Sequence, residues 1–323
     1  MNDVVVALRQ AQRIAIVSHR DPDPDTVGSG LALGLGLERL GKRVSWHCAD
    51  PVPEPIRFLA GADRYSQAPP DGGVDLIVTV DFGDAGRAKL QLPAGVSIAN
   101  IDHHATNTFF GSANFVDPTS AATGELVGRI IDALGVGWTP EMATAALVAI
   151  MTDTGSFQFP NTDKRALERA AMLREAGADL QSITYNVFRN KRFEALKLWG
   201  FAFSRLHRED GGLLVWTWIE DADLVDAEAL EEDLSGLIEQ IARSKGMRVA
   251  LLFSGVGGPL KVSCRTSQST PSVDAAALMA RFGGGGHVRA AGALIAASDH
   301  VAARGQVLEA AREALAAAKQ PVA

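Results

Sequence analysis

Residues 14–30 read IAIVSHRDPDPDTVGSG, and this stretch decides the fold. Its apolar start, residues 14–18, predicts a buried strand, and the small and apolar pattern from Gly28 onward predicts a helix over 28–40. The loop between them carries His19, Asp23 and Asp25. A buried strand that leads through a short loop into a helix is typical of the βαβ unit of a parallel sheet.

The same alternation continues through the first half of the chain. Further apolar runs predict strands over residues 44–47, 76–80 and 97–101. Apolar residues at helical spacing predict helices over residues 123–134, 140–151 and 164–176. The sequence therefore predicts an α/β domain with a doubly wound parallel sheet over residues 1–188.

The pattern changes in the second half. Charged and large apolar residues at three- and four-residue spacing predict a long helix over residues 190–207, within a connector at 189–210. After the turn signal EDGG at residues 209–212, further elements are predicted in the order strand 213–219, helix 223–243, strand 248–253, strand 260–264, helix 272–280, strand 292–296 and helix 299–319. This order predicts a smaller α+β domain over residues 211–323.

Composition excludes several classes of protein. With 323 residues, 47% of them hydrophobic and 21% charged, the chain has the composition of a globular protein of about two domains. No apolar run approaches the roughly 18 residues of a membrane helix, and no signal peptide is readable, so we expect a cytoplasmic protein. The two cysteines support neither a zinc ribbon nor a disulfide framework. A net charge of −7 argues against binding to long duplex DNA but not against a short anionic ligand.

Residues of the types that bind metal ions follow three of the predicted strands. They are His19, Asp23 and Asp25 after the first, Asp81 after the third, and Asp102, His103 and His104 after the fourth. The carboxyl ends of parallel strands meet at one edge of the sheet, so we expect these side chains to converge. Asp153 follows an apolar helical run, in a segment that can reach the same edge. Each motif alone can also be a turn or a helix cap, but their common position at strand ends favours a shared site.

Several carboxylates in one site need a compensating cation, because like charges raise one another's pKa. Four aspartates balance two divalent cations: Asp23, Asp25, Asp81 and Asp153. Mixed carboxylate and imidazole ligands without a thiolate favour Mn²⁺, with Mg²⁺ as the alternative. The sequence therefore predicts two Mn²⁺ ions per chain and room for a phosphate.

These motifs, in this order, resemble the DHH phosphoesterase superfamily. The resemblance rests on His19-x-x-Pro22-Asp23-x-Asp25-x-x-Gly28-Ser29, then Asp81, then Asp102-His103-His104, then Asp153. The tail, Gly283-Gly284-Gly285-Gly286-His287 with Ala290-Ala291-Gly292, resembles the signature of the companion DHHA1 domain. Length and architecture are similar to the stand-alone nanoRNase (oligoribonuclease) and pAp phosphatase group of the NrnA type.

The resemblance implies a role for each site residue. One metal would be held by His19, Asp23 and Asp81, and a second by Asp25, Asp81, His103 and Asp153, so that Asp81 bridges them. Asp102 would orient a histidine, and His104 would contact the scissile phosphate. Two positions depart from the family pattern, Asp21 where Asn is common and Pro24 where Gly is common. Neither departure removes a ligand.

The predicted reaction is an in-line attack on phosphorus by a hydroxide that bridges the two metals. Arg87 is a further candidate for neutralising charge on the phosphate. Substrate binding is predicted to involve Arg265, Gly284, Gly285, Gly286 and His287, because glycine-rich backbone and cationic groups suit a phosphate. Phe157 and Phe159 follow Asp153 and are candidates for stacking on a base, although phenylalanine is more often a core residue.

We therefore expect a Mn²⁺-dependent phosphoesterase and exoribonuclease. Its expected substrates are single-stranded RNA of about two to five nucleotides and 3′-phosphoadenosine 5′-phosphate (pAp), hydrolysed at a two-metal site. A homodimer is compatible with the sequence. Two alternatives stay open: a stand-alone cyclic-dinucleotide (c-di-AMP) phosphodiesterase that also cleaves the linear dinucleotide, and a noncatalytic nucleotide-binding protein.

Overall fold

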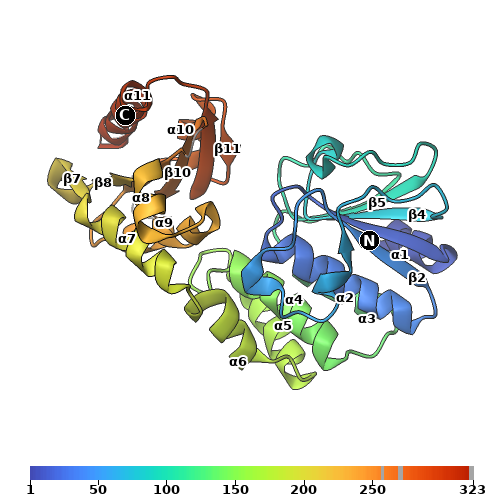
Figure 1. Ribbon diagram of the computed structural model, residues 1–323. Coiled ribbons are helices and arrows are strands. Elements are labelled where there is room, and N and C mark those ends of the chain that lie inside the picture. The colour runs from blue at the N-terminus through green and yellow to red at the C-terminus, as the bar shows by residue number, and fades with distance from the viewer. Residues whose placement is uncertain (256–257, 268–271, 320–323) are drawn as a thin grey trace. The chain divides into compact units, whose positions relative to one another are not determined.

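A computed structural model describes residues 1–255, 258–267 and 272–319 (Figure 1). The chain forms two compact units, Met1–Asn190 and Lys191–Ala323, each with its own six-stranded sheet. Among the described helices, none is both long enough and apolar enough to cross a membrane.

The sheet of the first unit is parallel throughout, in the order β3-β2-β1-β4-β5-β6. Its strands are β1 (Arg13–Ser18), β2 (Arg43–His47), β3 (Tyr65–Ser66), β4 (Leu76–Val80), β5 (Ser97–Asp102) and β6 (Ala113–Val116). The strand order changes direction between β1 and β4, which is the point where α/β sheets bind their ligands. The predicted parallel α/β fold is confirmed, and the four predicted strands match β1, β2, β4 and β5.

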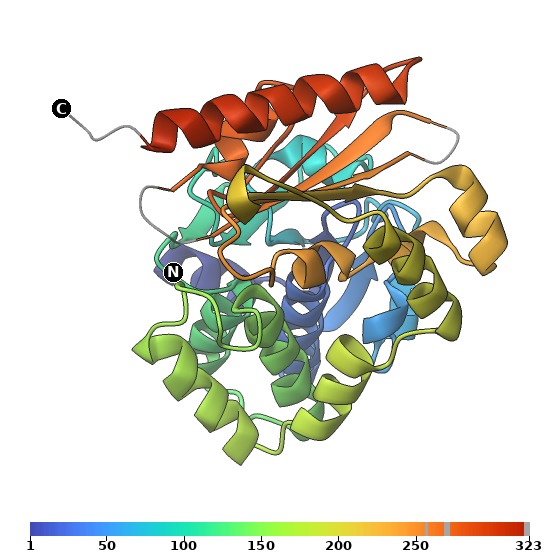
Figure 2. The ribbon, with the colours of Figure 1, turned by 90° about the vertical axis from the view of Figure 1, so that its left-hand side faces the viewer.

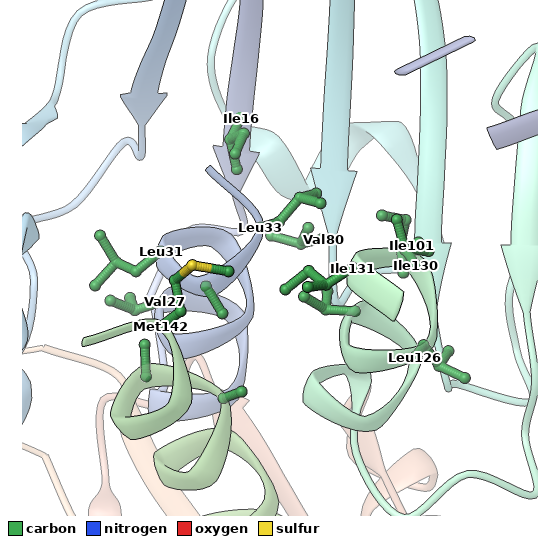
Figure 3. Close-up of a cluster of buried hydrophobic side chains, with 14 of the residues drawn as sticks. Ile16, Val27, Leu31, Leu33, Val80, Ile101, Leu126, Ile130, Ile131 and Met142 are labelled. Carbon is green, nitrogen blue, oxygen red and sulfur yellow. The ribbon is translucent and has the colours of Figure 1, made fainter. Parts of the chain in front are cut away.

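The helices of the first unit bury apolar residues in one core cluster with the strands of this sheet. They are α1 (Asn2–Gln10), α2 (Pro24–Arg39), α3 (Thr123–Leu134), α4 (Pro140–Asp153), α5 (Lys164–Glu175) and α6 (Leu180–Ile183). Figure 3 shows side chains of α2, α3 and the strands in this cluster, Val27, Ile130 and Ile16 among them, with Met142 of α4 beside α2. Helix α2 begins four residues before the predicted start, because Asp23 caps it and Pro24 suits its first turn.

The sheet of the second unit is mixed, in the order β11-β12-β10-β9-β8-β7, with only the β8–β9 pair parallel among the described pairs. Its strands are β7 (His207–Glu209), β8 (Leu214–Trp218), β9 (Val249–Ser254), β10 (Leu260–Thr266), β11 (Gly285–Gly286) and β12 (Ala290–Ile295). Helices α10 (Ala275–Ala280) and α11 (His300–Lys319) belong to one core cluster of this sheet. Figure 2 shows α11 lying along the strands.

A second core cluster of this unit involves α7 (Phe193–Ser204), α8 (Asp221–Ala227) and α9 (Leu237–Ile241). The predicted helix over 223–243 is wrong as one element, since Glu228 and Gly236 adopt left-handed backbone and end α8 before α9 begins. The predicted connector contains α7, whose residues Leu198, Trp199 and Ala202 pack in the second unit. The three-part division at residues 188 and 210 stays a prediction.

Candidate metal centre

The ends of three adjacent strands place the predicted ligands at one edge of the first sheet. His19 follows β1, Asp81 follows β4, and Asp102 is the last residue of β5, directly before His103 and His104. These strands are neighbours in the order β1-β4-β5, and they are parallel, so their carboxyl ends coincide. The convergence expected from strand ends is what the structure shows.

The first group of ligand atoms surrounds His19. Its Nε2 atom lies 3.6 Å from Oδ2 of Asp81 and 3.7 Å from Oδ2 of Asp23. Asp23 reaches this position because it is the N-cap of α2, where its Oδ1 accepts a hydrogen bond from the Thr26 backbone N–H. These three side chains could hold one metal ion.

The second group surrounds His103. Its Nε2 atom lies 3.3 Å from Oδ2 of Asp153, 3.6 Å from Oδ1 of Asp81 and 3.9 Å from Oδ2 of Asp25. Asp25, His103 and Asp153 could hold a metal ion, and so could Asp81, His103 and His104. Asp81 faces one group with Oδ2 and the other with Oδ1, so a single carboxylate connects both.

Asp81 occupies a costly backbone conformation. Its φ is 68°, in the left-handed region, and the residue is only 2% exposed. The Asp81 N–H donates to the carbonyl of Ile101, and Thr123 Oγ1 donates to its Oδ1 at 2.9 Å. Residues held in such conformations cluster at functional sites, where the surroundings enforce them.

Asp25 connects the metal centre to helix α3. The N-cap of α3, Ala122, has no side chain that can accept a hydrogen bond. The carboxylate of Asp25, which is fully buried, accepts from the backbone N–H of Thr123 at 2.7 Å and of Gly124 at 3.0 Å, and from Ser29 Oγ at 2.9 Å. A negative charge at a helix N-terminus is favourable. Sequence reasoning missed the role of α3, although a helix that starts Ala-Thr-Gly without a usual cap was a signal.

A chain of hydrogen bonds holds His104. Its Nδ1 lies 2.7 Å from Oδ1 of Asp102, whose Oδ2 accepts from Asn107 Nδ2. Asn107 also donates to Oδ1 of Asn100, which is buried. A donor at Nδ1 leaves Nε2 as the ring nitrogen available to a ligand. Neither asparagine was singled out from the sequence.

Acidic neighbours decide the charge of the two buried histidines. Burial lowers the pKa of His19, but hydrogen bonding to Asp23 and Asp81 and their charges outweigh it and raise this pKa to about 10. Burial also lowers the pKa of His103, but its acidic neighbours, Asp153 and Asp81 among them, outweigh burial and raise this pKa to about 11. Without a metal ion, both imidazoles therefore carry protons that balance the carboxylates.

The carboxyl groups of the second group are destabilised as anions. Burial, followed by the charges of Asp81 and Asp153, raises the pKa of Asp25 well above its ordinary value. Burial also dominates at Asp153, where the pKa rises to about 6. Clustered carboxylates of this kind are relieved by a bound cation. Oxygen and imidazole donors without a thiolate suit a divalent cation, so the residues present fit the predicted metal.

We expect the stability of the metal-free protein to fall as pH rises. The pKa values of His19 and His103 are about 10 and 11 in the folded state and about 6.5 in the unfolded state, so the folded state holds more protons between these limits. The contribution of both groups is fully present below about pH 6.5 and is lost as pH rises toward 10. Thermal unfolding in chelator between pH 6.5 and 9.5 measures this slope.

Excess divalent metal serves as the comparison for that experiment. Metal ligation needs neutral imidazoles, so binding strengthens as pH rises and the metal-loaded protein should lose the downward slope. A metal-free protein whose melting temperature rises over the same range would contradict the proton balance described for the two histidines.

Two arginines outside this centre are predicted to bind phosphate, and they differ in their contacts. Arg87 lies exposed in a short 3₁₀ helix after Asp81, and its carbonyl accepts the N–H of Arg20. In the second unit, Arg265 donates from Nη2 to Glu239 Oε1 at 2.7 Å, so this guanidinium already has an acidic partner. The role of either arginine in substrate binding stays a prediction.

The glycine run of the second unit forms part of the sheet. Gly285 and Gly286 make β11 and pair with β12, and the N–H of His287 donates to the carbonyl of Ala290 at 2.8 Å. A Cβ atom at Gly284 would lie 2.2 Å from the carbonyl oxygen of Gly292, so only glycine allows this close approach. The run is therefore a tight hairpin rather than a linker, and phosphate binding there stays a prediction.

Comparisons with known proteins agree with this geometry. Residues 13–150 match the DHH family, N-terminal domain, and residues 216–321 match the DHHA1 domain. Over 307 residues, the chain is 39% identical to the bifunctional oligoribonuclease and PAP phosphatase NrnA of Thermus thermophilus, covering 94% of this chain and 90% of that one. The chain is a DHH family phosphoesterase. The resemblance drawn from the motifs is thereby confirmed.

More distant relatives of this DHH phosphoesterase vary in activity. The cyclic-di-AMP phosphodiesterase PdeA of Listeria monocytogenes is 22% identical over 317 residues, which cover 87% of this chain and 44% of PdeA. The crystal structure of an exopolyphosphatase-related protein from Bacteroides fragilis has a TM-score of 0.85 at 20% identity and covers 98% of this chain and 96% of that one. This structural likeness supports the fold alone.

Proposed function

We propose that this DHH phosphoesterase hydrolyses RNA of about two to five nucleotides to nucleoside monophosphates and dephosphorylates pAp to AMP, with two Mn²⁺ ions per chain. The observation that carries the proposal is Asp81, whose two carboxylate oxygens face two separate groups of ligand atoms. The high identity to the Thermus enzyme over nearly the whole chain supports the substrates.

Each residue of the centre has a chemical task in this proposal. Bound divalent cations would activate water and polarise the phosphate. The chain would hold them through His19, Asp23 and Asp81 on one side and through Asp25, His103 and Asp153 on the other, with Asp81 shared. The cap that Asp25 provides for α3 fixes the position of its carboxylate, and Thr123 fixes that of Asp81.

His104 is the proposed donor to the substrate phosphate. Burial lowers its pKa, but the hydrogen bond and charge of Asp102 and the charge of Asp81 outweigh burial, so the net shift is upward. The upward shift of this pKa favours the imidazole with a proton on each nitrogen. With Nδ1 engaged by Asp102, Nε2 can donate to a phosphate oxygen, and such charge-assisted hydrogen bonds are strong.

The second unit is the proposed site of substrate selection. Arg265, the Gly284–Gly286 hairpin and His287 would bind the end of a short substrate, and Arg87 would assist at the metal centre. A homodimer, a cytoplasmic location and the exclusion of long duplex DNA remain part of the proposal.

A turnover assay with Mn²⁺ tests the proposal on four substrates: a diribonucleotide, a long single-stranded RNA, pAp and c-di-AMP. We expect rapid, chelator-sensitive loss of the diribonucleotide and pAp, while the long RNA and c-di-AMP persist. Preference for c-di-AMP would instead support a cyclic-dinucleotide phosphodiesterase. Binding of pAp without turnover of any substrate would support a noncatalytic nucleotide-binding protein.

A further inference from the structure

The loop that follows Asp153, one of the candidate metal ligands, carries an exposed aromatic ring. Phe159 is 49% exposed, and its backbone N–H donates to the carbonyl of Thr154, the residue next to Asp153. Asn161 Nδ2 then donates to the carbonyl of Asp153 at 3.0 Å and to that of Ala121 at 3.1 Å. These bonds tie the far end of the loop to the backbone of Asp153, and Phe159 lies between the two ends.

The backbone of this loop is strained where it carries the ring. Gly155, Ser156 and Phe157 are consecutive residues with φ values of 55°, 57° and 65°, all in the left-handed region. Two of the three are not glycine, and such conformations persist only where the surroundings enforce them. Thr154 Oγ1 contributes to that enforcement by accepting the Phe157 N–H at 3.1 Å.

The strained turn holds the Phe159 ring against the main chain. A Cβ atom at Gly155 would lie 2.5 Å from Cε1 and from Cζ of this ring, so the ring covers the space that a side chain would take. Phe157, by contrast, packs against the apolar core of the first unit. Of the two phenylalanines considered from the sequence, only Phe159 is thus both fixed in place and half open to solvent.

We propose that Phe159 is a stacking platform for a nucleobase of the substrate. The proposal rests on the proposed function, because the base would belong to a nucleotide whose phosphate occupies the metal centre. Every base has an apolar face, so stacking tolerates any sequence and suits an enzyme for short RNA and pAp alike. A ring held by the backbone loses little freedom when a base covers it, and such preorganisation favours binding.

A second exposed ring makes the choice of residue testable. Phe109 is 62% exposed, has a φ of 55° and lies on the loop after His104, where its N–H donates to Asn107 Oδ1. The Phe159 ring lies directly over Gly155, whereas the Phe109 ring is not among the nearest neighbours of any glycine in the described part of the chain. This difference favours Phe159 as the platform.

The test compares Phe159→Leu, Phe159→Trp and Phe109→Leu with the wild type. The substrates are a diribonucleotide and two abasic analogues, each lacking one base. For Phe159→Leu we expect KM for the diribonucleotide to rise about 5- to 150-fold, the range for loss of one base–aromatic stack, while kcat changes little. One abasic analogue should be hydrolysed equally by Phe159→Leu and the wild type, and Phe159→Trp should restore the KM.

Binding without turnover gives an independent readout. Equilibrium dialysis of AMP, a product of the proposed reactions, against the protein with Mn²⁺ should show weaker binding to Phe159→Leu than to the wild type. Phe203→Leu, a change at an exposed phenylalanine of the second unit, should bind AMP like the wild type. Mn²⁺ affinity should be the same in all variants, because Phe159 supplies no ligand atom.

Unchanged KM and AMP binding in Phe159→Leu would overturn the proposal. So would an equal loss on both abasic analogues, or an effect of Phe109→Leu in place of Phe159→Leu. Failure of the proposed function itself looks different, because the wild type would then leave the diribonucleotide and pAp intact. The AMP dialysis would still decide whether Phe159 binds a base.

Discussion

Asp81→Asn is expected to lower kcat/KM for a diribonucleotide by more than about 100-fold. Loss of a residue that only hydrogen-bonds to a metal ligand already lowers metal affinity or activity roughly 10- to 100-fold, and Asp81 is itself a proposed ligand. Asp81 is the carboxylate that faces both groups of ligand atoms, so the change weakens both positions at once. Asparagine keeps the shape of the side chain and tolerates the left-handed φ of 68°. The variant therefore isolates the lost charge from a change in backbone.

Asp84→Asn is the matched control for this substitution. Asp84 lies on the same loop, but it is exposed, and its side chain accepts a hydrogen bond from the backbone N–H of Gly86. We expect near wild-type turnover from Asp84→Asn and unchanged circular dichroism from both variants. Equilibrium dialysis with Mn²⁺ should show weaker binding by Asp81→Asn alone. Wild-type activity in Asp81→Asn would refute the shared position of Asp81.

Asp25→Asn is expected to separate stability from function. In the metal-free protein, burial and the neighbouring charges of Asp81 and Asp153 raise the pKa of Asp25, so its charge is a cost to folding at neutral pH. Asparagine removes that charge and can still accept an N–H from the start of α3. We therefore expect a higher melting temperature in chelator, together with loss of turnover and weaker Mn²⁺ binding.

The control for this variant is Asp21→Asn, in the loop directly before α2. The Asp21 side chain is 81% exposed and lies outside the groups of ligand atoms. We expect it to change neither the melting temperature nor Mn²⁺ binding appreciably. Shifts in melting temperature are readable here, because about 1 kcal/mol moves a domain of this size by roughly 2–4 °C. A metal-free Asp25→Asn protein less stable than the wild type would show that the carboxylate stabilises α3 more than its charge costs.

Strand ends were the predictable part of the centre. The apolar runs before His19 and Asp81 are short, β-branched and bounded by polar residues, so their ends are fixed to within a residue. A parallel sheet then brings those ends together whatever the separation along the chain. Asp153 was harder to place, because it ends helix α4 and only the packing of that helix brings it to the edge.

The hydrogen bonds that hold the ligands in place could not be predicted from the sequence, for a different reason. Thr123 and Gly124 act through backbone N–H groups that every residue has, so residue type does not mark them. The strained turn at residues 155–157 is likewise enforced by hydrogen bonds that close only in the folded chain. The break between α8 and α9 depends on the left-handed backbone of Glu228. Glutamate is a good helix former, so its residue type predicts that the helix continues.

The bond between Asp25 and the start of α3 joins residues 98 positions apart. The segment between them contains β2, β3, β4, β5 and β6, so this one contact joins the start of α3 to the metal centre across most of the sheet. Any opening of the first unit that releases α3 therefore also releases the Asp25 carboxylate from the partners that hold it in place.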